Sequence, residues 1–184
     1  MKVTVTAIAD VLIIEPKVFC DSRGFFLESF NQRYFNAATG TDFNFVQDNH
    51  SRSRKGVLRG LHYQVGCPQG KLVRVTRGAI FDVAVDLRIN SPTFGHWDAH
   101  ELSAQNHQQK WIPPGCAHGF LVMSNCADVL YKTTGYYSPG QERCLRWDDP
   151  ALAIAWPLSG LPLLSAKDQA GLELRFSETF LSSI

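Results

Sequence analysis

The chain has 184 residues, of which 45% are hydrophobic and 19% charged, a composition typical of a globular protein with one sizeable core. A formal net charge of +1 provides no overall attraction for nucleic acid or an anionic membrane, and no apolar run approaches membrane-spanning length, so neither partner is expected. Five cysteines without a CxxC pair, and no recognisable signal peptide in residues 1–16, predict reduced thiols in a cytoplasmic protein.

Turn-forming residues recur at short intervals and separate short runs rich in Val, Ile, Phe and Tyr, as in proteins with many β-strands. Residues 31–38 are a helix candidate that Gly40 would end. Strands are expected at 56–64, 71–75, 79–88, 119–123 and 129–133, and the third of these alternates between two faces with a period of two. Ser165 is a candidate N-cap of a short second helix, with Asp168 at its third position.

These elements contain no internal repeat and no linker, so they predict one domain over residues 1–184. The spacing of the strands favours an all-β fold, in which two sheets form a jelly-roll β-barrel with a few short helices.

Two histidine motifs are the most informative local feature. Residues 56–62 read Gly-x5-His and end at His62, and residues 113–118 read Pro-x-Gly-x2-His and end at His118. This pair is similar to the skeleton of the cupin barrel, whose metal-binding members continue the first motif as His-x-His and then Glu. Those two positions hold Gln64 and Gln69 here, and neutral amides are poor transition-metal ligands beside imidazoles. We therefore expect no metal and an acid–base site.

Arg59 precedes His62 in the same predicted strand, and strict alternation places their side chains on opposite faces. Gly60 between them would permit a β-bulge that redirects one of the two. If both face inwards, a bidentate phosphate donor lies beside a base.

Each remaining candidate has an ordinary structural explanation when it is taken alone. His118 and Tyr131 could be core residues, Lys71 could lie at a strand edge and Asp168 could only cap a helix. The combination of these groups with His62 on strands that a barrel brings together indicates proton-transfer chemistry. The chain contains no Gly-x-Gly-x-x-Gly or phosphate-loop motif, no nucleophile elbow and no zinc-finger spacing.

Over nearly its whole length the chain resembles the dTDP-4-dehydrorhamnose 3,5-epimerase family. The resemblance is carried by seven segments, at residues 21–30 (DSRGFFLESF), 45–51 (FVQDNHS), 56–64 (GVLRGLHYQ), 69–73 (QGKLV), 113–120 (PPGCAHGF), 131–134 (YKTT) and 164–168 (LSAKD). It implies a metal-free cupin jelly roll that needs no cofactor and forms a homodimer by exchanging N-terminal strands.

The resemblance also implies a role for individual residues. His62 would be the base, Asp168 its orienting carboxylate, Tyr131 the acid on the opposite face of the sugar, and Lys71 the group that steadies an enolate oxygen. Substrate contacts would come from Arg23, Glu28, Gln47, Asn49, Arg59, His118, Tyr137, Glu142 and Lys167. Of these, Arg23 and Glu28 are candidates for reaching the neighbouring subunit's site.

The implied substrate is dTDP-4-dehydro-6-deoxy-D-glucose, whose C3 and C5 hydrogens are both α to the C4 carbonyl. Inversion needs a base and an acid on opposite faces of the sugar, and His62 with Tyr131 supplies such a pair. Three alternatives remain, namely an epimerase of C3 or C5 alone, a ketoisomerase on a related nucleotide sugar, and a nucleotide-sugar-binding protein without catalysis. A metal-dependent cupin oxygenase is disfavoured by Gln64 and Gln69.

Overall fold

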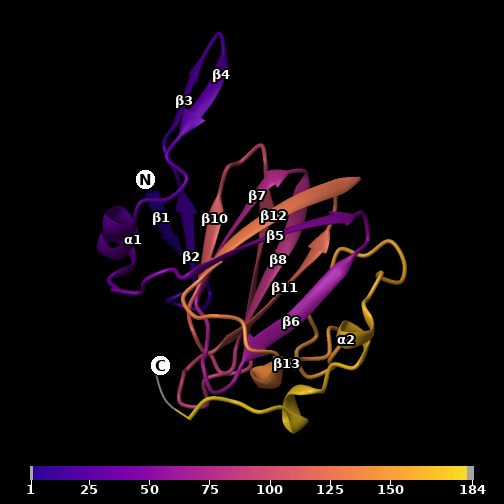
Figure 1. Ribbon diagram of the computed structural model, residues 1–184. Coiled ribbons are helices and arrows are strands. Elements are labelled where there is room, and N and C mark those ends of the chain that lie inside the picture. The colour runs from indigo at the N-terminus through magenta and orange to yellow at the C-terminus, as the bar shows by residue number, and fades with distance from the viewer. Residues whose placement is uncertain (1, 182–184) are drawn as a thin grey trace.

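The computed structural model describes residues 2–181, and its core is two facing β-sheets (Figure 1). The six-stranded sheet has the order β1-β2-β10-β7-β12-β5, with bounds Lys2–Val5, Leu12–Glu15, Gln109–Ile112, Lys71–Arg77, Cys126–Thr133 and Gln47–Arg54. The five-stranded sheet has the order β13-β6-β11-β8-β9, with bounds Glu142–Cys144, Leu58–Gln64, Cys116–Val122, Ala79–Asp86 and Trp97–Ser103. The predicted all-β jelly roll is therefore confirmed, with two facing sheets and not one closed barrel.

A third, two-stranded sheet projects from this body. Its strands β3 (Val18–Asp21) and β4 (Gly24–Leu27) form a hairpin that extends away from both large sheets, as Figure 1 shows. The turn-forming residues 21–24 (DSRG) lie at its tip, but the pattern of residues did not predict this extension.

Helix is as scarce as the sequence predicted. Helix α1 (Gln32–Thr39) begins after Asn31, whose side chain accepts two backbone N–H groups, and it ends at Gly40 with a left-handed φ of 68°. Helix α2 (Ala166–Gln169) and the 3-10 turns η1 (Pro139–Gln141) and η2 (Leu174–Phe176) are shorter still. No helix among residues 2–181 is long and apolar enough to cross a membrane.

The alternation predicted for residues 79–88 explains why the five-stranded sheet is buried on both sides. Ile80 and Ala84 of β8 pack between the two sheets, whereas Val83 and Val85 pack on the opposite face. That opposite face is covered by the chain after β13, including Leu145, Leu152, Trp156 and Phe180. Strand β8 ends at Asp86, two residues before the predicted end, because the Asp86 carboxylate accepts hydrogen bonds from Arg88, Ser91 and Thr93 in the following turn.

The other predicted strands were placed correctly, but their ends differ. The strand expected at 56–64 starts at Leu58, and the remaining three were predicted too short. The strand expected at 119–123 starts three residues earlier, at Cys116, because β11 pairs with β8 from Cys116 onwards. The strand expected at 129–133 starts at Cys126, and the one expected at 71–75 continues to Arg77. Pairing with neighbouring strands extends all three beyond their apolar centres.

Candidate active site

A cavity of about 420 Å³ is lined by strands of both sheets. Eleven of the thirteen predicted site residues line it, namely Gln47, Asn49, Arg59, His62, Lys71, His118, Tyr131, Tyr137, Glu142, Lys167 and Asp168. The two sheets contribute different groups, since His62 and His118 belong to the five-stranded sheet and Lys71 and Tyr131 to the six-stranded sheet.

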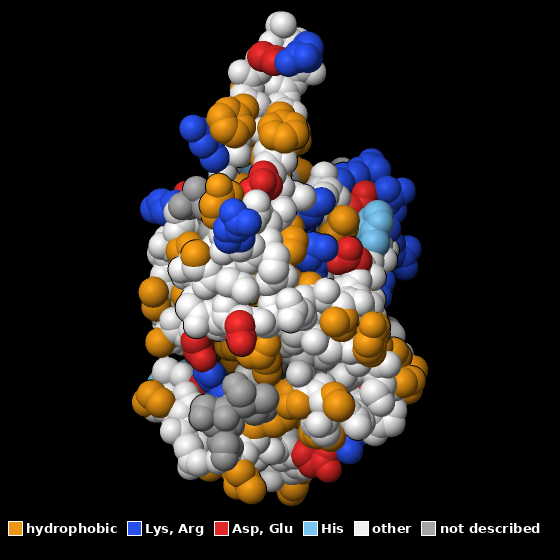
Figure 2. Space-filling model, turned by 60° about the vertical axis from the view of Figure 1, so that its left-hand side comes forward, with side chains coloured by type: hydrophobic (Ala, Val, Ile, Leu, Met, Phe, Trp, Pro, Cys, Tyr) orange, Lys and Arg blue, Asp and Glu red, His pale blue; other side chains and the backbone are white. Residues whose placement is uncertain are grey.

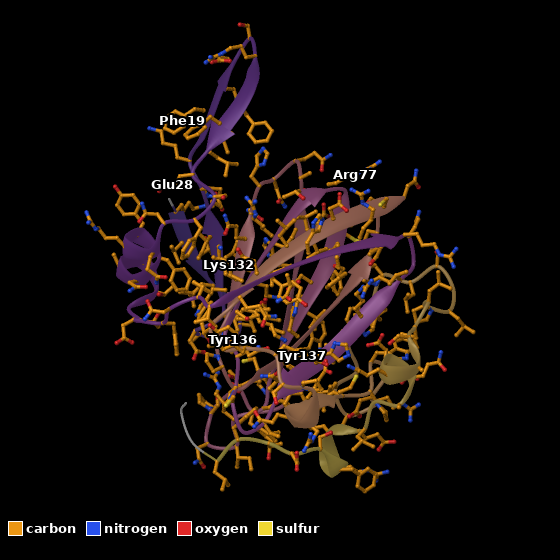
Figure 3. The ribbon with its side chains drawn as sticks, viewed as in Figure 1. Phe19, Glu28, Arg77, Lys132, Tyr136 and Tyr137 are labelled. Atoms are coloured by element: carbon orange, nitrogen blue, oxygen red, sulfur yellow. The ribbon has the colours of Figure 1, made fainter. Side chains whose placement is uncertain are left out.

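Arg23 and Glu28 lie outside this cavity. Arg23 is at the tip of the projecting hairpin, where its exposed guanidinium pairs with Asp21 at 2.5 Å. Glu28 follows β4 at the foot of the hairpin and accepts a hydrogen bond from Asn31 Nδ2 at 3.2 Å; Figure 3 shows it on a different part of the chain from Tyr137. One chain alone therefore does not bring these two residues to the cavity, and their predicted contact with a neighbouring subunit's site stays a prediction.

A bulge in β6 turns both Arg59 and His62 towards the cavity. His62 pairs with His118 and Arg59 pairs with Phe120, so β6 advances three residues where β11 advances two. The extra residue in β6 is the bulge. At the bulge, Gly60 has a φ of +119°, and a Cβ there would come within 2.5 Å of the β11 backbone. The bulge predicted at this glycine is confirmed, because both side chains line the cavity.

His62 lies beside the buried carboxylate of Asp168. Its Nε2 is 2.9 Å from Asp168 Oδ1, an ion-pair distance, although the ring is not turned for a straight hydrogen bond. Asp168 Oδ1 also accepts the backbone N–H of Gly60 at 3.0 Å. The other oxygen accepts the Ser165 hydroxyl at 2.6 Å and the Ser165 N–H at 3.2 Å. The carboxylate is thus held from both sides.

The same contacts keep Asp168 ionised. Burial alone would raise the pKa of this carboxyl, but the nearby His62 and the hydrogen bonds from Ser165 and Gly60 outweigh burial and hold the pKa well below its usual range. Asp168 is also the third residue of α2, where it completes a capping box with Ser165. The Asp168 carboxylate therefore has two roles, since it caps the helix, as the sequence predicted, and lies beside His62.

Lys71 and Tyr131 face His62 from the six-stranded sheet. Lys71 is the first residue of β7, and its Nζ crosses to donate to the His62 carbonyl oxygen at 3.0 Å. Burial lowers the pKa of Lys71 to about 8, so its proton is held loosely near neutral pH. Burial raises the pKa of Tyr131 above its ordinary value, so the phenol is protonated at neutral pH and can donate.

His118 forms a second histidine–carboxylate pair in the cavity wall. Its Nε2 lies 2.7 Å from Oδ2 of Asp82, and both residues are buried. Burial lowers the pKa of His118 against the pull of Asp82. For Asp82, burial would raise the pKa, but His118 and Lys110 outweigh it and lower the pKa.

The cavity mouth carries an aromatic ring among polar groups. The Tyr137 hydroxyl donates to Glu142 Oε2 at 2.8 Å, and Lys167 forms an ion pair with the same carboxylate. The Tyr137 N–H donates to Gln47 Oε1 at 3.0 Å. The ring itself is exposed, so one face remains for a planar ligand.

The two glutamines at the metal-ligand positions of cupins serve the fold. Gln64 donates to the backbone oxygens of Cys67 and Tyr136, and its own oxygen accepts the Ser138 N–H at 2.7 Å. Gln69 donates to the backbone oxygen of Gly135 at 2.6 Å. Both amides hold the loops at one end of the cavity, and the Gln64 amide uses both of its N–H groups and its oxygen in doing so.

Among residues 2–181, one group of side chains has metal-like spacing, and it fits a metal poorly. Its members are His62, Cys144 and Asp168. Burial raises the pKa of the Cys144 thiol to about 12, whereas a cysteine binds metal as the thiolate. The oxygens of Asp168 already accept hydrogen bonds from Gly60 and Ser165.

Seven cavity residues were not predicted as part of the site, namely Ser51, Tyr63, Gln64, Gln69, Gly119, Phe120 and Ser165. Ser51 had a usable signal, because Gln47, Asn49 and Ser51 follow a period of two and share one face of β5. Ser165 was predicted only as a helix cap, and its second function depends on where α2 lies against β6.

Comparison with known proteins gives one consistent family. The family model described as dTDP-4-dehydrorhamnose 3,5-epimerase matches residues 5–175. The dTDP-4-dehydrorhamnose 3,5-epimerase of Pseudomonas aeruginosa is 58% identical over 180 residues, which are 98% of this chain and 99% of that protein. The enzyme of the same name from Salmonella typhimurium is 59% identical over 171 residues, covering 92% and 93% of the two chains.

A solved structure agrees with this result. The crystal structure of dTDP-6-deoxy-D-glucose-3,5-epimerase from Legionella pneumophila in complex with dTDP-4-keto-L-rhamnose superimposes with a TM-score of 0.97. It is 49% identical in sequence, and the match covers 100% of this chain and 99% of that one.

Proposed function

The chain belongs to the dTDP-4-dehydrorhamnose 3,5-epimerase family, and on that premise we propose that it inverts C3 and C5 of dTDP-4-dehydro-6-deoxy-D-glucose to give dTDP-4-dehydro-L-rhamnose. One observation carries the proposal. His62 and Tyr131 enter the cavity from opposite sheets, with Lys71 beside them. A sugar ring between the sheets would have a base on one face and an acid on the other.

The reaction requires a proton to leave one face of the ring and another to arrive at the opposite face. His62 removes the proton, and the ionised Asp168 at 2.9 Å stabilises the imidazolium that forms. The electron pair moves to the C4 oxygen, where the Lys71 ammonium stabilises the enolate. Tyr131 then protonates the carbon from the other face and becomes a phenolate. His62 must release its proton to solvent and Tyr131 must take one up before the same steps at the second carbon complete the double inversion.

The remaining cavity residues suit the nucleotide part of the substrate. Arg59, fixed by a hydrogen bond from its Nε to Ser53 Oγ at 3.0 Å, can donate its other N–H groups to the diphosphate. The exposed ring of Tyr137 can stack on the thymine base, and Glu142 with Lys167 provides polar contacts around it. Gln47, Asn49 and His118 offer further hydrogen bonds to the substrate.

We also propose that the protein acts as a homodimer in the cytoplasm. The projecting hairpin exposes Phe19, Phe25 and Phe26. Figure 2 shows hydrophobic side chains on the part of the molecule that projects from the main body. An apolar, protruding hairpin suits burial against a second copy of the chain. Arg23 and Glu28 of the partner would then reach the cavity. Five free cysteines are compatible with the reducing cytoplasm.

The test is incubation of the purified protein with dTDP-4-dehydro-6-deoxy-D-glucose, with NMR identification of the product. The expected product has both centres inverted, and His62→Ala should form none. His100→Ala is the matched control, because His100 hydrogen-bonds Gln108 and does not line the cavity. Inversion at C3 or C5 alone would identify a single-centre epimerase, and migration of the carbonyl would identify a ketoisomerase.

A further inference from the structure

A fully buried lysine crosses the space between the two sheets. Lys110 belongs to β10 of the six-stranded sheet, and its Nζ donates to the backbone oxygens of Asp82 and Asp98 on the facing sheet, each at 3.1 Å. The same nitrogen lies 3.0 Å from Asp98 Oδ2 and 3.6 Å from Asp82 Oδ1. A buried ammonium is costly unless carboxylates compensate it, and the proposed reaction makes no use of this one.

Asp82 connects this lysine to the substrate cavity. One carboxylate oxygen faces Lys110, and the other lies 2.7 Å from Nε2 of His118, which lines the cavity. Among the described residues, Asp82 Oδ1 accepts no hydrogen bond, so the Lys110 ammonium is its electrostatic partner. A change at Lys110 would therefore reach His118 through Asp82.

The charges of this cluster favour one state of His118. Because Asp82 is shared between Lys110 and His118, the lysine weakens the pull of the carboxylate on a proton of the imidazole. A neutral His118 that donates its Nε2 proton to Asp82 keeps a lone pair on Nδ1 for a ligand. A protonated His118 would have no acceptor to offer.

We propose that Lys110 is a positioning residue for the substrate site, which acts through Asp82 to hold His118 in the neutral form protonated on Nε2, with Nδ1 as an acceptor for a substrate hydroxyl. The inference rests on the proposed function to the extent that His118 contacts the substrate there. The new point is that Lys110, a buried charge outside the cavity lining, determines whether His118 offers a hydrogen-bond acceptor to the cavity.

Charged and titratable groups reach His118 from every neighbouring strand. Asp82 on β8 favours protonation of the ring, whereas Lys71 on β7 and Lys110 on β10 oppose it. His62 is the residue opposite His118 on β6. Asp98 on β9 balances Lys110. Lys110 differs from Lys71 because it is paired with the carboxylate that His118 uses.

The test is long-range ¹H–¹⁵N NMR of the histidines in the substrate-free protein between about pH 5 and pH 8. The wild-type His118 should show the neutral pattern protonated on Nε2. Lys110→Met and Lys110→Gln remove the charge, and Gln keeps donors for the two backbone oxygens. In both variants His118 should take up a proton at higher pH, with an upward shift of about one pKa unit.

A charge-balanced variant separates electrostatics from packing. The double variant Lys110→Met/Asp98→Leu replaces both partners of the ion pair with apolar residues. Proteins often tolerate such a replacement without loss of stability. Its His118 should shift upwards by less than in the single variants, because the loss of Asp98 compensates part of the lost repulsion. If His118 titrates as in the wild type in whichever variants fold, Lys110 has only a structural role and the proposal is wrong.

Steady-state kinetics provide the second readout. At the acidic end of the range, KM of the single variants should rise several-fold over the wild type, with a smaller change in kcat, and the difference should disappear at higher pH. The NMR measurement needs no turnover, so failure of the proposed epimerase activity would leave the result on Lys110 intact.

Discussion

Replacement of Asp168 by Asn tests the histidine–carboxylate pair at nearly constant volume. The carboxylate is buried and lies 2.9 Å from His62 Nε2. Two unit charges at this distance interact by roughly 6 kcal/mol at an effective dielectric constant of about 20. His62 is 26% exposed and the Asn dipole remains, so about half of this energy should be lost. The kcat/KM of Asp168→Asn should fall by about 100-fold, since each 1.4 kcal/mol is tenfold.

The same substitution has a signature in the pH dependence of stability. The pKa of Asp168 is lowered in the folded protein, so its charge stabilises the fold above the unfolded pKa of about 4. This contribution is lost as the pH falls through the lower, folded pKa. The Tm difference between wild type and variant should therefore be largest at neutral pH and shrink in acid.

The assay is kcat/KM on the nucleotide sugar together with thermal unfolding. Asp149→Asn is the matched control, because Asp149 is an equally buried carboxylate that accepts backbone N–H groups of Ala151 and Leu174 away from the cavity. It should lower Tm and leave kcat/KM close to the wild type. A folded Asp168→Asn variant with wild-type kcat/KM would refute the argument from charge.

Three further predictions follow from the cavity. Because the pKa of Lys71 is about 8, kcat/KM should decline as the pH rises through that value and the ammonium is lost. Lys71→Met should remove this decline at alkaline pH. If the decline is unchanged in the variant, another group causes it. Arg59→Ala should weaken dTDP binding by about tenfold or more in calorimetry, through loss of charge-assisted hydrogen bonds, and unchanged affinity would place the diphosphate elsewhere. Activity should survive exhaustive chelation, whereas loss that one metal restores would contradict the acid–base account.

Short sequence patterns predicted those parts of the site that depend only on residues close together in the sequence. Gly60 indicated a bulge because a glycine within a strand permits one, and the bulge explains how Arg59 and His62 share the cavity. Ser165 followed three residues later by Asp168 predicted the helix cap that the structure has. Both inferences needed only the chemistry of a short segment.

Contacts between distant strands could not be predicted in this way. Alternation placed Asp82 on one face with Ile80 and Ala84, but the meeting of this carboxylate with His118 and Lys110 depends on how the two sheets pack. Strand ends were missed for a related reason, since Cys116 and Cys126 join their strands through pairing with neighbours and not through their own pattern. The specific residue roles came from the family resemblance.

The central claim is that proton removal and proton return come from opposite sheets. Tyr131→Phe removes only the donor on the six-stranded sheet, while His62, Asp168 and Lys71 stay in place. The most direct measurement is NMR of the sugar pool after Tyr131→Phe has been incubated with dTDP-4-dehydro-6-deoxy-D-glucose in heavy water. The account predicts that deuterium enters the recovered substrate at C3, C5 or both, while inverted product falls steeply. Inversion at the wild-type rate would show that Tyr131 is not the acid and would contradict the account.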